Sequence, residues 1–329
     1  MVDWQPPADS AGHLLTKLNI GLIVITSVFV ITRLCTRIFM LPSLGWDDLL
    51  ATIAWIGVVA ISSQGIIAVQ QGLGTHIDQI PPEALDALYK TLLTFQLVFF
   101  VTVGFVRFSI VASYLKLSQE RWFRFGLYLL AFLTFTITTI AFFFLLTECK
   151  YIPDQWDLTN PNRQCIPKSE EAKMFYANVF TIVAIDIGLL ALPIWLVWST
   201  MKFSGKRFQV ILVFFVGIFA VIAGIVHMIL IVTTDFAVDT SYKLIFVCPW
   251  SALQGHVGVW TACFPAFQPL FRLVKEKYWG TKTTVPVPHL NTISEVDLRD
   301  PSICTTQNGS NLSDSRESGK SVCKGREEC

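Results

Sequence analysis

The sequence predicts an all-α membrane protein: a bundle of seven transmembrane helices with the N-terminus outside and the C-terminus in the cytoplasm. Two observations lead to this fold class. Of the 329 residues, 53% are hydrophobic and only 15% are charged, whereas soluble proteins carry about 25% charged residues. Seven apolar segments, each near the roughly 20 residues that cross a bilayer, also follow one another along the chain. A soluble bundle would have too little polar surface to cover them.

The predicted spans divide the chain into two tails and a membrane domain. Residues 1–13 form a short extracellular tail without the basic region of a cleavable signal peptide, so the first span has to act as its own anchor. Residues 14–272 hold the helices, and residues 280–329, rich in Ser, Thr and Asn, are predicted to be a disordered cytoplasmic tail. The predicted spans are Leu14–Ile31, Leu49–Val69, Thr91–Leu115, Phe125–Leu146, Phe175–Trp198, Val210–Val232 and Leu244–Phe271.

The orientation follows from the Lys and Arg residues between the spans. The stretch QQGLGTHIDQIPPEALDAL of the second connection has none, the fourth connection includes Lys150, Arg163 and Lys168, and the sixth has Lys243. Because cytoplasmic connections carry the excess of cations, the odd-numbered connections are assigned to the cytoplasm. The cations on that side are Arg33, Arg37, Lys116, Arg121, Arg124, Lys202, Lys206, Arg207, Arg272, Lys275 and Lys277.

The same orientation places Cys149 and Cys165 in the long fourth connection, on the outer face. An oxidising compartment would allow these two residues to form a disulfide. Cys248, at the start of the seventh span, lies on the same face and is a competing partner.

Polar residues inside the predicted spans are the candidates for a ligand pocket. Asp186 lies near the middle of the fifth span, His227 in the sixth, and Gln254 with His256 in the seventh. Because ionisable groups are costly in a bilayer unless they face protein or water, these four are expected to form an inward-facing polar layer below an outer opening. The alternative is that they only hydrogen-bond neighbouring helices.

The doubled acid of the segment LGWDDLL, Asp47 and Asp48, begins the second span. One Asp is expected to cap the helix and the other to pair with an arginine, from Arg33, Arg37 or Arg107. A structural role as a clamp between helices is favoured for Arg107. Pro193 and Pro265 are expected to kink the fifth and seventh helices.

Motifs for catalysis are absent from the sequence. It has no HExxH, no Cys-x-x-Cys and no Gly-x-Ser-x-Gly motif, so no catalytic residue and no metal site are assigned. Neither a basic stripe nor a nucleic-acid-binding motif is present. No internal repeat supports a transporter built from two similar halves.

Several segments in residues 14–272 resemble the fungal rhodopsin-like family of integral membrane proteins. They are TRLCTRIFMLPSLGWDDLL, GLGTHI, RFSIVASYLKLS, AIDIGLLALPIWLVW and CFPAFQPLF. The resemblance implies seven helices with an outside N-terminus, and a surface receptor or a companion of a secondary-metabolite gene cluster. The family pattern commonly has Lys at the position of Arg107, Arg at His227 and Glu at Gln254, so a charge pair between the last two helices is replaced here by neutral side chains.

No retinal cofactor is expected, because the span Leu244–Phe271 contains no lysine for a Schiff base. The expected function is a receptor-like plasma-membrane protein that senses a small hydrophobic ligand and contacts a cytosolic signalling partner. The alternatives are a membrane-embedded enzyme or accessory factor of secondary-metabolite biosynthesis and, less favoured, a transporter. The bilayer itself is the other expected partner.

Overall fold

The computed structural model describes residues 12–40, 45–116, 118–156, 163–199, 207–234 and 239–267. These residues fall in the first of two compact units of the chain, Met1–Lys282. The predicted cytoplasmic tail, 280–329, and nearly all of the predicted N-terminal tail lie outside the described residues.

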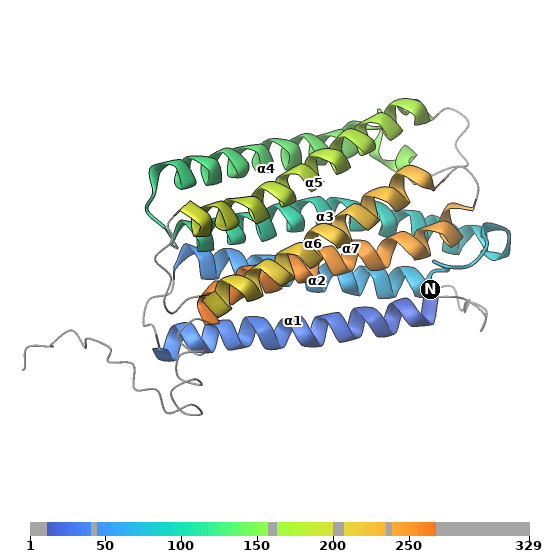
Figure 1. The fold of residues 1–329 in the computed structure, drawn as a ribbon. Coiled ribbons are helices and arrows are strands. Elements are labelled where there is room, and N and C mark those ends of the chain that lie inside the picture. Colours follow the sequence, from blue (N-terminus) through green and yellow to red (C-terminus); the bar gives the residue numbers. More distant parts are fainter. Residues whose placement is uncertain are drawn as a thin grey trace, which may run out of the picture. The chain divides into compact units, whose positions relative to one another are not determined.

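Seven long helices make up the described part of the chain, and Figure 1 shows them lying side by side. Apart from an isolated bridge between Cys149 and Cys165, the described residues form no β-structure. The helices are α1 (Gly12–Met40), α2 (Trp46–Gln70), α3 (Pro82–Leu115), α4 (Arg121–Thr147), α5 (Lys168–Ser199), α6 (Arg207–Thr233) and α7 (Thr240–Cys263). Three short 3₁₀ helices follow α2, α4 and α7: η1 (Ile77–Gln79), η2 (Ile152–Gln155) and η3 (Phe264–Phe267).

Some helices extend beyond the predicted apolar spans. The polar residues that begin at Pro82, predicted to belong to a connection, form the first turns of α3, with proline at a position that needs no backbone donor. Conversely, α7 ends at Cys263, eight residues before Phe271, where the seventh span is predicted to end. Pro265 therefore does not kink α7 but lies in η3, while the proline inside α7 is Pro249. Pro193 is inside α5, as predicted.

Each helix packs against its neighbours in the sequence, and α7 also packs against α1. Helix α7 also packs against α2 and α3, so it contacts four of the other six helices. In Figure 1, α1 and α4 lie on opposite sides of the bundle, with α7 between them. The central position of α7 explains why most of its residues are buried.

Six helices, α1 to α6, are long and apolar enough to cross a membrane. Helix α7 is less apolar, because its buried surface includes Ser241, Ser251, Gln254, His256 and Thr261. Large apolar side chains are exposed on the outside of the bundle, among them Val28 on α1, Phe135 on α4 and Phe219 on α6. This arrangement fits helices that face lipid, and the chain is a multi-pass membrane protein.

Candidate functional site

An ion pair joins α3 to α5 inside the bundle. Arg107 Nε donates to Asp186 Oδ1 at 2.8 Å and Arg107 Nη2 donates to Asp186 Oδ2 at 3.0 Å. Two parallel hydrogen bonds of this kind combine charge attraction with a fixed orientation. The expectation that Arg107 reaches the acids at the start of α2 is not met, because its guanidinium is engaged by Asp186.

The pair continues into a hydrogen-bonded chain on α7 and α6. Gln254 Nε2 donates to Asp186 Oδ2 at 3.2 Å, and Gln254 Oε1 lies 3.2 Å from His227 Nδ1. His227 Nε2 lies 2.9 Å from Ser251 Oγ. Because the Gln254 carbonyl oxygen can only accept, His227 carries a hydrogen on Nδ1. In this tautomer Nε2 can accept the hydrogen of the Ser251 hydroxyl, whose other acceptor within reach is the carbonyl oxygen of Val247 at 3.2 Å.

A small cavity adjoins this network in the space between α3, α5, α6 and α7. Its volume is about 50 Å³, room for a few water molecules. Arg107, Asp186 and Gln254 supply polar groups to its wall, together with Tyr114 and Thr261. The rest of the wall is apolar: Val103, Val106, Ile110, Leu189, Leu190, Gly217, Ala220, Val221, Gly255 and Gly258.

His256 does not belong to this group, although it is only two residues from Gln254. Two residues along a helix point to nearly opposite faces, so His256 turns toward α1 and α2. Its Nδ1 lies 2.7 Å from Thr26 Oγ1 and its Nε2 lies 2.9 Å from Ser62 Oγ. Trp260 Nε1 completes the set by donating to Thr26 Oγ1 at 2.8 Å. The single polar layer predicted from the sequence is thus two networks on opposite faces of α7.

A second cluster of charges lies where α1 ends and α2 begins. Arg33 is completely buried, and its Nη2 donates to Asp47 Oδ2 at 2.8 Å while its Nε donates to Asp48 Oδ1 at 2.9 Å. Its Nη1 donates to the carbonyl oxygen of Ala262 on α7. The cluster therefore holds three helices together through one guanidinium.

Asp48 caps α2 and Asp47 pairs with arginines, as expected from the sequence, and each also makes further contacts. Asp47 accepts from Arg33, from Arg37 at 3.0 Å and from Lys116 at the end of α3. Asp48 caps the helix by accepting from the backbone N–H of Gly45 at 3.1 Å, and it also accepts from Arg33. One Asp thus combines capping with ion pairing, and the other pairs with three cations.

Cys149 and Cys165 form the predicted disulfide, in the connection between α4 and α5. Cys248, the competing partner considered from the sequence, is a free, buried cysteine. On the same end of the bundle, the α2–α3 connection is bound to the start of α7 through His76, whose Nδ1 lies 2.9 Å from Asp239 Oδ2. The hydrogen bonds that Asp239 accepts from His76 and from the backbone N–H of Ile77 lower the pKa of its carboxyl.

No group of three or more His, Cys, Asp or Glu side chains in the described ranges is arranged to hold a metal ion. The Arg107–Asp186 site has the groups that can recognise a small molecule: an ion pair in which Arg107 is buried and Asp186 half-buried, an amide and a hydroxyl, beside an apolar wall.

Several members of these networks escaped the sequence analysis: Thr26, Ser62, Tyr114, Ser251, Trp260 and Ser113, whose hydroxyl lies 3.5 Å from Arg33 Nη2. For Ser251 a signal existed, since it lies three residues before Gln254 and hence on the same face of the helix. For the isolated hydroxyls of Thr26 and Ser62 there was none, because Ser and Thr are common in transmembrane helices.

A family model described as the fungal rhodopsin domain matches residues 32–273. The chain belongs to this family. The match to the fungal rhodopsin domain begins beside Arg33 and takes in all the residues of the Arg107–Asp186 site and of the Arg33 cluster. No solved structure matches the chain.

One relative of this fungal rhodopsin domain protein is the "Fugralins biosynthesis cluster protein 2" of Gibberella zeae. The two are 20% identical over 257 residues, which are 76% of this chain and 63% of the relative. The chain thus spans less than two thirds of the relative's length.

Proposed function

We propose that this protein is a receptor-like membrane protein of seven spans that binds a small lipophilic molecule at the Arg107–Asp186 site. The observation that carries the proposal is the two-fold hydrogen-bonded ion pair beside a cavity inside the bundle. Ionisable residues within membrane spans are costly unless they face protein or water, and this supports a functional hypothesis for the pair.

The proposed topology has the N-terminus outside and the C-terminus in the cytoplasm of a plasma-membrane protein. Helix α7 crosses as the seventh span, since the other helices shelter its polar residues from lipid. The Cys149–Cys165 disulfide then lies outside, where it can form, and the Arg33 cluster lies at the cytoplasmic end, where a signalling partner would bind.

Two helices connect the proposed ligand site to the cytoplasmic end. Helix α3 carries Arg107 and ends directly before Lys116, nine residues or about 14 Å further along, and Lys116 contacts Asp47. Helix α7 carries both Gln254 and Ala262, about 12 Å apart, and Ala262 accepts from Arg33. A ligand that competes for Arg107 or Gln254 would shift α3 and α7, and the shift would reach the Arg33 cluster.

The test replaces the chromosomal copy by Asp186→Asn and, separately, by Gln254→Leu. Asp186→Asn keeps the size of the side chain but removes its charge, and Gln254→Leu cuts the link to His227. Both are expected to reduce the response to the native stimulus, read as transcripts, at unchanged surface amount. The matched control is Asp86→Asn, at an exposed position where Asp86 pairs with Lys90. A normal response from both core variants would rule the mechanism out.

A role in biosynthesis is the second candidate, and the name of the Gibberella zeae relative favours it. In this role the protein would be an enzyme or accessory factor for a lipophilic metabolite, with Asp186 and His227 as acid and base. Deleting the gene in its host and measuring metabolites and transcripts together separates the two. Accumulation of a precursor supports the enzyme, whereas a lost transcriptional response with intact chemistry supports the receptor.

The proposed site contains no retinal. The lysine nearest to it on the last helix is Lys243, in the first turn of α7, about 16 Å along the helix from Gln254. A purified protein that absorbs no visible light is the expected result.

A further inference from the structure

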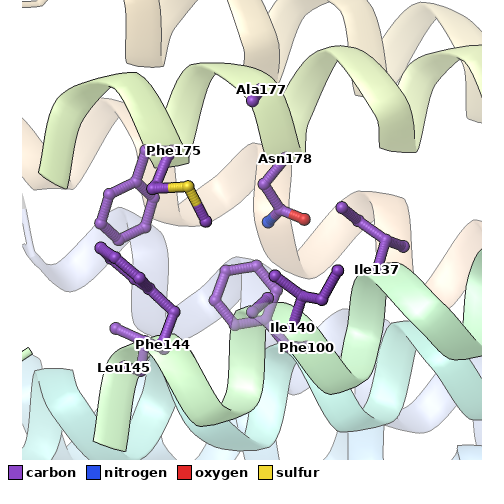
Figure 2. Close-up of a pocket in the computed structure, with 10 residues that line it drawn as sticks. Phe100, Ile137, Ile140, Phe144, Leu145, Phe175, Ala177 and Asn178 are labelled. Carbon is purple, nitrogen blue, oxygen red and sulfur yellow. The ribbon is translucent and has the colours of Figure 1, made fainter. Parts of the chain in front are cut away.

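A second pocket lies between α3, α4 and α5 and shares no lining residue with the Arg107–Asp186 cavity. Figure 2 shows its wall, which is built from aromatic and aliphatic side chains. Among them are Phe100 from α3, Ile137 and Phe144 from α4, and Met174 and Phe175 from α5. One lining side chain breaks this pattern: Asn178.

Asn178 is buried, with 6% of its surface exposed. In Figure 2 its amide points from α5 into the space bounded by Phe100, Ile137 and Ile140. Neither its Oδ1 nor its Nδ2 has a hydrogen-bond partner in the protein. Between lipid-facing helices an unpaired amide is costly, because no bulk water reaches it. The wall of the pocket therefore contains one unpaired amide, with N–H donors on Nδ2 and an acceptor on Oδ1 side by side.

The pocket is open toward the surrounding lipid. Ile140 and Ala177, both lining residues, are exposed on the outer surface of the bundle. The cavity volume of about 50 Å³ is too small for a whole drug-sized ligand. It suits the end of a molecule whose remainder stays among the acyl chains.

The lining also selects the chemistry of that end. A carboxamide or a neutral carboxylic acid carries a donor and an acceptor side by side, and so complements both atoms of Asn178 at once. No lining residue is a cation, so an ionised carboxylate would lie there without compensation. An ester or ether offers only acceptors and would leave Asn178 Oδ1 unpaired.

We propose that the pocket between α3, α4 and α5 binds the head of a lipophilic carboxamide or neutral carboxylic acid from the bilayer, held by a pair of hydrogen bonds to Asn178. This site goes beyond the proposed function, because it lies apart from the Arg107–Asp186 cavity and requires no signalling response.

Photolabelling of the purified full chain in phosphatidylcholine nanodiscs tests the proposal. The probes are hexadecanamide, hexadecanoic acid at pH 5, methyl hexadecanoate and hexadecane. Each carries a diazirine near one end of the chain, which is the end next to the head group in the first three. The amide and the acid are expected to label the peptides that contain Phe144 and Phe175 about tenfold more than hexadecane does, the equivalent of one to two hydrogen bonds. The methyl ester is expected to label little more than hexadecane.

Asn178→Leu removes both polar atoms and is expected to lower labelling by the amide to the level of hexadecane. Because it removes an unpaired polar group, this variant is expected to fold, which size-exclusion chromatography checks. The matched control is Thr181→Val on the same helix, where the Thr181 hydroxyl donates to the backbone carbonyl of Ala177. This variant should keep the full excess of labelling by the amide over labelling by hexadecane. Equal labelling by all four probes, or an excess that survives Asn178→Leu, would overturn the proposal.

Discussion

Arg33 is completely buried, and its guanidinium donates to two carboxylates, a backbone carbonyl of α7 and the Ser113 hydroxyl of α3. Burial of such a set is favourable only while every member keeps its partners, since an uncompensated buried charge is strongly destabilising. The same consideration applies to Arg107 and Asp186.

Arg33→Met is expected to lower the free energy of unfolding by about 3–5 kcal/mol, because it leaves Asp47 and Asp48 buried with less compensation. Denaturant titration in detergent micelles measures this. The matched control is Lys116→Met, which removes a cation from the same Asp47 but at a side chain that is 47% exposed. It should cost less than about 1 kcal/mol. Equal losses of unfolding free energy in the two variants would show that the burial of Arg33 does not account for its contribution to stability.

Asp239 gives the protein a pH-dependent contact outside the spans. Its pKa is lowered in the folded chain, chiefly by the hydrogen bond from His76. Such a carboxylate stabilises the fold above its unfolded pKa, and the contribution is lost as the pH falls through the folded pKa. We expect Asp239→Asn to lower the unfolding temperature at pH 6, and this difference from the wild type to shrink as the pH approaches 3.

The backbone at Asp239 supports this choice of variant, because its φ of 54° is one that asparagine tolerates well. Thermal unfolding of both proteins at pH 6, 4.5 and 3 provides the measurement. A difference that stays constant over this range would exclude ionisation of Asp239 as its source.

At the scale of elements, α3 and α7 approach each other closely at Gly258. A Cβ atom there would lie 2.5 Å from Val106 Cγ1, so a side chain at this position would force the helices apart. Small residues at such crossings let transmembrane helices pack tightly. Gly258 and Val106 also line the Arg107–Asp186 cavity, so the spacing of these helices affects the site.

Gly258→Ala is therefore expected to destabilise the protein by about 1–3 kcal/mol, in the range of overpacked cores. Val106→Ala, added to Gly258→Ala, should restore part of the loss because it removes the opposing methyl groups. Gly21→Ala is the control, since nothing lies within 4 Å of a Cβ there. It should be neutral or slightly stabilising. Unfolding in detergent measures all three, and no rescue by Val106→Ala would contradict the proposed contact.

For the whole molecule, the proposed topology makes a prediction about glycosylation. The tail holds two acceptor sequences, at Asn308 and Asn311, and a cytoplasmic tail never meets the glycosylation machinery. Both are expected to stay unmodified. Gln164→Thr makes Asn162, in the connection of the disulfide, the start of a new acceptor sequence, and it is expected to be glycosylated. Gel mobility before and after endoglycosidase treatment shows the outcome, and a modified tail would reverse the topology.

The number of helices and their approximate places could be predicted, because long apolar runs need only local composition. Helix ends were less predictable. The first turns of α3 are polar and project past the apolar span, and α7 ends early where η3 begins. Polar helical turns outside a membrane resemble loops in composition, so hydropathy does not detect them.

The sequence by itself determined the membrane class, the seven helices and the family resemblance, and it limited the outer disulfide to Cys149, Cys165 and their competitor Cys248, among which the structure pairs Cys149 with Cys165. Only the tertiary structure decided which polar groups meet: Arg107 with Asp186, Gln254 with His227, His256 with Thr26 and Ser62, and no partner for Asn178. The physical reason is that a helix is specified by neighbours along the chain. Pairing across helices depends instead on how each helix is rotated and how deep it sits, which many weak packing contacts set together.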